Sequence, residues 1–270
     1  MSTIGSPLNT TSLVTTAMKL PGIKISREEF LNKEFKNRYP VATIRKAIDM
    51  NPAAAGIPRE EIEELAKESI KYETSKVSAI SVAAGIPGGF ALLGTIPADT
   101  AQFFGFILRI TQKLAYLYGF DEFRLKEDEI DDSTLNEIMI FLGIMFGVNE
   151  ANSAVIKLAE SVAKRILDKL PQKALTKGVV YPIVKTFAQK LGQNMTKEIF
   201  AKSLSKAVPF IGGVANGGMT YVSFRICSNR LKKKFSELPI SDPNYYKSLW
   251  DESDSIIDFT DLENVDVQSE

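Results

Sequence analysis

Apolar residues recur at helical spacing along most of the chain, without the sustained alternation typical of strands. Ser26, with a glutamate three residues later, forms a capping box that predicts a helix through Lys36. Pro58 and the glutamates after it predict a second helix, and Thr134 with Glu137 predicts a third. Two stripes of helical period extend the pattern: Ile62, Leu65, Ala66 and Ile70, and then Val155, Ala159, Val162, Ile166 and Leu170. The predicted fold is all-α, a multi-helix bundle.

Two long stretches, residues 77–98 and 207–224, carry no charged side chain. The first has 22 residues, which is long enough to cross a bilayer. Glycines and prolines dilute the hydrophobicity of both, so we predict glycine-rich hydrophobic helical hairpins rather than straight spanning helices. Glycine pairs four residues apart permit close helix packing, either in a membrane or in a soluble bundle.

A helix with a polar stripe is predicted to follow the first of these stretches. The context Ile96-Pro-Ala-Asp places Asp99 in a first helical turn, where a carboxylate is favoured. The candidates for a polar cavity or a helix cap are Asp99, Gln102, Arg109 and Gln112. The rest of this helix is a wide aromatic arc, which other helices or lipid must cover.

The residue types narrow the chemistry. The chain has no histidine, which removes the usual general base near neutral pH, the commonest metal ligand and any serine–histidine triad. Cys227 is the only cysteine, which favours an intracellular compartment, and we interpret it as a small buried hydrophobe. We expect no catalytic residue, no metal and no cofactor, and a non-enzymatic role is favoured.

Charge is distributed unevenly, although the 33 basic and 33 acidic residues balance. Residues 251–270 hold eight acidic residues and no basic one. Residues 157–234 hold 16 Lys and Arg against three acidic residues, a net charge of +13. Such a surface favours phosphate-bearing partners, although a solvated helix face is an equally open reading. The predicted docking residues are Lys157, Lys164, Arg165, Lys202, Lys206, Arg225, Arg230, Lys232, Lys233 and Lys234.

Composition also predicts the domain organisation. We expect a flexible Ser/Thr-rich segment over residues 1–20, one helical domain over 21–238 and an acidic, disordered tail over 239–270. The first residues lack the pattern of a secretory signal, so a cytoplasmic, peripherally membrane-associated protein is predicted.

Three stretches resemble one known family: Lys19-Leu-Pro-Gly-Ile-Lys-Ile-Ser-Arg-Glu-Glu-Phe-Leu31; Ala84-Gly-Ile-Pro-Gly-Gly-Phe-Ala91 with Ile96-Pro-Ala-Asp99, Gln112 and Tyr118-Gly-Phe-Asp121; and Val208-Pro-Phe-Ile-Gly-Gly213 with Asn216. Their order and spacing are similar to those of the EcsC family. The resemblance implies a bacterial helical protein and is consistent with membrane association. It implies neither a reaction nor a catalytic residue.

These observations leave three functions open. The leading hypothesis is a non-enzymatic protein that docks on anionic lipid of the cytoplasmic leaflet, with the acidic tail competing for the basic face. The alternative is a soluble protein-interaction or immunity module with an acidic protein partner. A carrier or enzyme for a lipid-like molecule, using Asp99, is the third. Nucleic-acid binding is not expected, because the lysine run at 232–234 is short and no recognised motif accompanies it.

Overall fold

The computed structural model describes residues 10–83, 98–126, 129–167 and 217–250. This part of the chain is all-α, as predicted, apart from two antiparallel strands of two residues each. The elements are α1 (Thr10–Met18), α2 (Arg27–Phe35), α3 (Val41–Asp49), α4 (Arg59–Ala83), α5 (Ala98–Leu117), β1 (Leu125–Lys126), β2 (Glu129–Ile130), α6 (Asp132–Met145), α7 (Glu150–Leu167), α10 (Gly217–Ser236) and the 3-10 turn η2 (Pro239–Ser241). Residues 243–250 are also helical.

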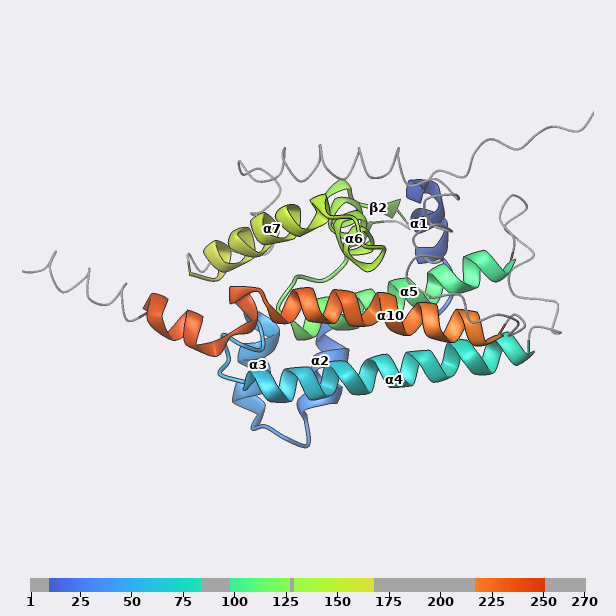
Figure 1. The fold of residues 1–270 in the computed structure, drawn as a ribbon. Helices are drawn as coiled ribbons and strands as arrows, with labels where there is room; N and C mark the ends of the chain where they lie inside the picture. Colours follow the sequence, from blue (N-terminus) through green and yellow to red (C-terminus); the bar gives the residue numbers. More distant parts are fainter. Residues whose placement is uncertain (1–9, 84–97, 127–128, 168–216, 251–270) are drawn as a thin grey trace, which may run out of the picture.

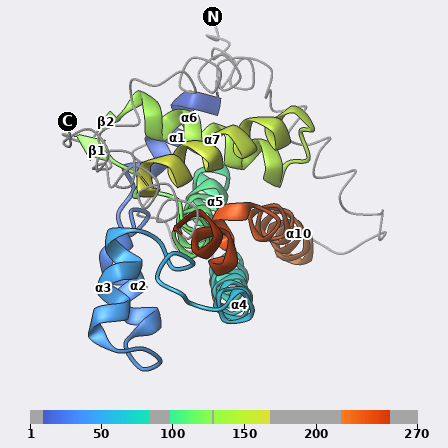
Figure 2. The ribbon, with the colours of Figure 1, turned by 90° about the vertical axis from the view of Figure 1, so that its left-hand side faces the viewer.

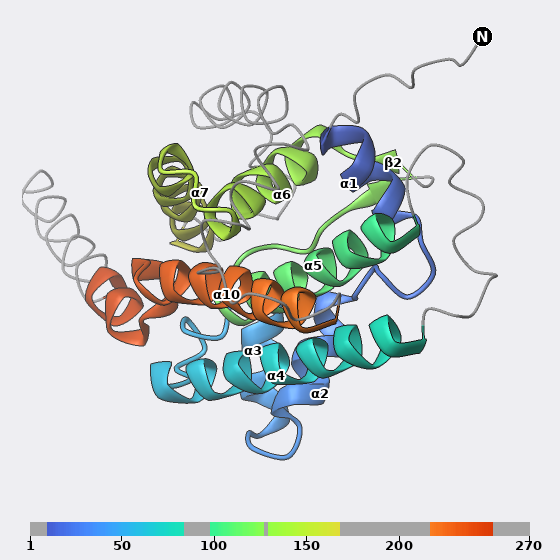
Figure 3. The ribbon, with the colours of Figure 1, turned by 45° about the vertical axis from the view of Figure 1, so that its right-hand side comes forward.

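Three long helices, α4, α5 and α10, lie side by side along the length of the molecule (Figure 1). The chain directions of α5 and α10 agree, and α4 runs opposite to both (Figure 3). Helices α6 and α7 form a second layer over α5 and α10, while α2 and α3 lie to the other side (Figure 2). Helix α5 therefore runs through the middle of the bundle, in contact with α1, α2, α4, α6 and α10.

Local capping explains where several helices begin. The Ser26 side chain accepts a hydrogen bond from the Glu29 N–H, which confirms the predicted cap of α2. Helix α6 begins three residues earlier than predicted, because Asp131 caps it and accepts a hydrogen bond from the Thr134 N–H at 3.0 Å.

The core is built around the aromatic side chains of α5 and its neighbours. Phe120, Phe141 and Phe235 meet with ring centroids 4.8–4.9 Å apart. Along α5, the described apolar residues from Phe104 to Tyr118 are all buried. Other helices therefore cover this described part of the aromatic arc, so lipid is not needed to cover these residues. Both predicted apolar stripes are buried as well, apart from Leu170, which lies outside the described residues.

The structure corrects both predicted chain ends. Residues 10–18 form α1, whose Val14, Ala17 and Met18 pack into the core, so this part of the segment expected to be flexible is ordered. Residues 239–250 fold back onto the body through buried Ile240 and Tyr246, so the predicted tail begins too early. Residues 1–9 and 251–270 lie outside the described residues.

The two uncharged stretches are only partly described. Helix α4 takes in residues 77–83, and α10 takes in 217–224, while 84–97 and 207–216 lie outside the described residues. Within the described part of the chain, none of the helices combines the length and apolar content that a bilayer crossing requires. The predicted glycine-rich hairpins therefore stay a prediction.

Candidate functional site

The polar stripe of α5 contacts the extended segment that joins α1 to α2. The Gln112 side chain accepts a hydrogen bond from the Ile25 N–H at 2.9 Å and donates to the Ile23 carbonyl at 2.9 Å. Tyr116 adds a hydrogen bond from its hydroxyl to the Ile25 carbonyl at 3.2 Å. These bonds satisfy backbone groups of a segment that has no helical partners of its own. Gln112 thus positions the chain entering α2.

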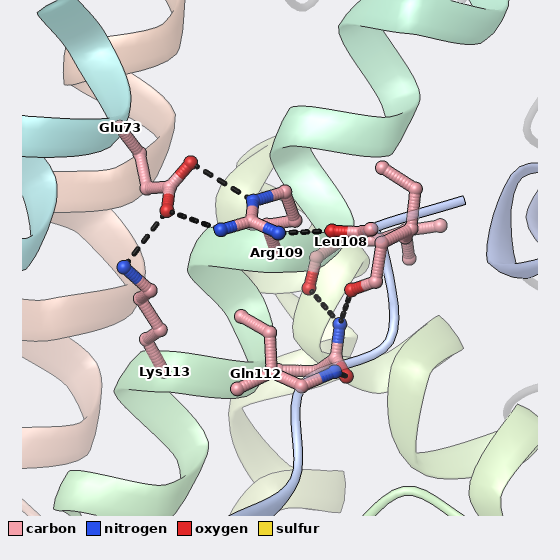
Figure 4. A network of polar contacts seen from close by, with 8 residues as sticks. Glu73, Leu108, Arg109, Gln112 and Lys113 are labelled. Atoms are coloured by element: carbon pink, nitrogen blue, oxygen red, sulfur yellow. Dashed lines mark hydrogen bonds and ion pairs between the residues drawn. The ribbon is translucent and has the colours of Figure 1, made fainter. Parts of the chain in front are cut away.

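A buried carboxylate on α4 joins this stripe. Glu73 is fully buried, and its two oxygens accept hydrogen bonds from Arg109 at 3.1 Å each, while Lys113 Nζ lies 2.8 Å from Oε1 (Figure 4). Burial alone would raise the pKa of the Glu73 carboxyl, but the bonds from Arg109 and Lys113 outweigh it and hold that pKa below its ordinary value. Arg109 also donates to the carbonyl of Gly22. The network ties α4, α5 and the N-terminal segment together.

Asp99 and Gln102, the other two candidates for a polar cavity, both lie in α5, whose first residue is Ala98. Their side chains lie outside the described residues. Of the four candidates, Arg109 and Gln112 are thus the two whose side chains the structure describes, and their hydrogen bonds join α5 to α4 and to the segment before α2. Glu73, their missed neighbour, lies 36 residues before Arg109, and no local spacing signals the pair.

A second ionic cluster lies at the C-terminal end of α5. Arg165 of α7 contacts the Asp121 carboxylate at 2.5 Å, and both side chains are buried. Arg27 lies nearby, where its guanidinium donates to backbone carbonyls of Phe120 and Ala47. Burial raises the pKa of Asp121 although Arg165 and Arg27 lower it. Arg165 therefore holds the bundle together, and its predicted place on a docking surface is wrong.

Glu137 on α6 is a half-buried carboxyl beside this cluster. Burial, together with the negative charges of Asp121 and Asp131, raises the pKa of Glu137 to about 8, and Arg124 and Arg165 oppose the rise. The carboxyl is therefore mostly protonated at neutral pH. The sequence identifies Glu137 as a capping residue, but its environment arises first from burial and then from the charge of the distant Asp121, neither of which local spacing reveals.

The remaining basic residues lie on two helices. Lys157 and Lys164 are exposed on α7, where Lys157 pairs with Glu160 at 3.0 Å. On α10, Arg225 and Lys233 are exposed, and the other basic residues are half-buried: Arg230, Lys232 and Lys234. Arg230 donates to the Met145 carbonyl at 3.4 Å, and Lys234 lies 3.9 Å from Glu237. Lys202 and Lys206 lie outside the described residues.

One face of α10 forms a continuous exposed stripe, which we call the α10 stripe: Val222, Arg225, Asn229 and Lys233. Their spacing of three or four residues places them on one side of a helix. Helix α10 contains no acidic residue between Gly217 and Ser236, so nothing on the helix itself neutralises this side. The α10 stripe thus presents two exposed basic side chains, Arg225 and Lys233, on a helix that has no carboxylate.

Comparisons with known protein families, curated proteins and solved structures find no match for this chain. The resemblance to the EcsC family therefore stays a prediction. Within the fold, two of the stretches that carry it lie together, because Gln112 bonds to Ile23 and Ile25, and Arg27 donates to the carbonyl of Phe120. The motif residues thus have a structural role at the junction of α2 and α5.

Proposed function

We propose that this protein is a non-enzymatic, peripheral membrane protein that docks on anionic lipid through the α10 stripe. The observation that carries the proposal is the run of exposed Arg225, Asn229 and Lys233 on a helix without acidic residues. Exposed Val222 on the same side adds an apolar contact for the headgroup region. A peripheral mode of binding is supported by α5, whose described aromatic side chains are already covered by protein.

The expected strength follows from charge. Each basic residue near an anionic leaflet contributes about 1 kcal/mol, and salt screens this attraction over roughly 8 Å at physiological ionic strength. Arg225 and Lys233, with half-buried Lys232 beside them, supply a few kcal/mol at low salt. Binding of this kind is reversible, selective for anionic lipid and weakened by salt.

Vesicle flotation tests the proposal. Full-length protein is mixed with neutral or anionic vesicles at low and high salt, and the floating fraction is measured. Recovery with anionic vesicles at low salt supports docking through charge, whereas flotation that is indifferent to salt and lipid charge rejects it. The alternative, a soluble interaction or immunity module with an acidic protein partner, becomes the better reading if the protein is monodisperse without detergent and does not float.

A further inference from the structure

An exposed tyrosine on α4 lies close to two ammonium groups. Tyr72 is 51% exposed, and the Nζ atoms of Lys76 and Lys113 lie 4.6 and 4.8 Å from its ring centroid. Both distances are within the range of cation–π attraction. Lys76 comes from the next turn of α4 and Lys113 from α5, so two helices build the arrangement. We call Tyr72, Lys76 and Lys113 the lysine–tyrosine cluster.

The cluster carries more positive charge than its surroundings neutralise. Among the described residues, Glu73 is the one carboxylate that pairs with it, and both Glu73 oxygens are occupied by Arg109 and Lys113. Lys76 forms no ion pair with any residue that the structure describes. Arg109 lies outside the cluster but shares Glu73 with Lys113, so Lys76, Arg109 and Lys113 against Glu73 leave a net charge of +2 around Tyr72.

The acidic residues earlier on α4 are already paired elsewhere. Glu68, one turn before Tyr72, lies 3.8 Å from Arg38, and Glu61 and Glu64 also face that arginine. Their charge is directed toward the end of α2 rather than toward the cluster. These three carboxylates therefore do not pair with the lysine–tyrosine cluster, which leaves it open to an added anion.

We infer that the lysine–tyrosine cluster is a binding site for a phosphate monoester. A phosphate monoester carries close to two negative charges at neutral pH, which matches the net charge of the site. Half-buried Lys76 and the exposed Tyr72 hydroxyl supply the donors, while Lys113, whose side chain is 11% exposed and pairs with Glu73, adds positive charge close to them. A phosphodiester has one negative charge and fits the site less well. The site lies on α4 and α5 and uses no residue of the α10 stripe.

Chemical-shift titration of the full-length protein with glycerol 3-phosphate tests this inference. We expect saturable shifts of amides near Tyr72, and weaker binding of diethyl phosphate. Lys76→Ala should weaken binding about tenfold, as expected for one lost charge-assisted hydrogen bond. Lys71→Ala removes an exposed lysine from the same helix and serves as the matched control, which should bind normally. Absence of saturation, equal binding of the diester, or equal loss in the two variants would overturn the inference.

Vesicles identify the source of the phosphate group. In a variant with the α10 stripe reversed, Arg225→Glu with Lys233→Glu, binding to phosphatidic acid that exceeds binding to phosphatidylglycerol assigns the site to a lipid headgroup. Saturable binding of glycerol 3-phosphate without this preference assigns it to a soluble phosphate monoester. The reversed variant keeps the lysine–tyrosine cluster, so the two proposals are tested separately. If docking through the α10 stripe fails, the titration with glycerol 3-phosphate is unaffected. If that titration fails, the flotation test of the α10 stripe is unaffected.

Discussion

Replacing Glu73 by Gln tests the buried network that joins α4 to α5. The substitution preserves the size of the side chain but leaves Arg109 and Lys113, whose side chains are 19% and 11% exposed, without their carboxylate. Removing one partner of a buried ion pair costs about 3–5 kcal/mol, and the remaining exposure of the two cations places the expected loss near 3 kcal/mol. That is a large share of the 5–15 kcal/mol typical of a folded domain.

Urea unfolding followed by circular dichroism measures this loss. Glu64→Gln is the matched control, because Glu64 lies on the same helix and pairs with Arg38 at 3.7 Å, but its side chain is 62% exposed. An exposed pair contributes about 1 kcal/mol or less. We expect Glu73→Gln to lower the free energy of unfolding near neutral pH by several times more than Glu64→Gln.

The pH dependence provides a second check on the same residue. The folded-state pKa of Glu73 lies below its ordinary value of 4.5, so its contribution is fully present above that value and is lost as pH falls through the folded-state pKa. The difference between the native protein and Glu73→Gln should therefore shrink in acid. Equal losses for the two variants, or a difference that stays constant from neutral pH into acid, would refute the role assigned to Glu73.

Three further substitutions test other parts of the fold. Gly119→Ala should lower the free energy of unfolding in urea by about 2–3 kcal/mol, because Gly119 has φ +100° and a Cβ there would lie 2.6 Å from Asn51 Nδ2. A variant as stable as the native protein would contradict this close approach. Arg165→Ala should lower the melting temperature, because it leaves buried Asp121 without its ion-pair partner. The floating fraction with anionic vesicles should stay unchanged. A loss of flotation without a loss of stability would show that Arg165 belongs to the docking surface. Glu137 binds its proton more tightly in the folded state, so the stability of the native protein should fall as pH rises from about 4.5 to about 8. At pH values above that range, Glu137→Gln should melt at a higher temperature than the native protein. An identical pH profile of the two proteins would exclude the raised pKa of Glu137.

Local sequence signals predicted α2, α4, α5, α6 and α7, because capping and apolar periodicity act over a few residues. The cap at Ser26 and the buried stripe beginning at Ile62 follow from such spacing. In α1, the spacing of Val14, Ala17 and Met18 is also helical, but the Ser/Thr-rich composition concealed it. Composition averages over a segment, whereas three well-placed apolar side chains are enough to dock a short helix.

Long-range pairing explains what sequence reasoning missed at the candidate sites. Arg109 was recognised as part of a polar stripe, but its partner Glu73 comes from another helix. Arg165 stood among lysines in a basic stretch, and only its contact with Asp121, 44 residues away, separates it from the surface residues. A charged residue at the surface and one in a buried pair look alike until the fold brings the partner into place.

Flotation of two charge-reversed proteins tests membrane docking most directly. Arg225→Glu with Lys233→Glu reverses the α10 stripe, while Arg45→Glu with Lys67→Glu makes the same change in net charge at exposed residues of α3 and α4. With anionic vesicles at low salt, the native protein and the second variant should float, and the first should not, since reversal removes about 2 kcal/mol and adds repulsion of similar size. Equal flotation of the two variants, or flotation of the native protein that survives high salt, would contradict docking through α10.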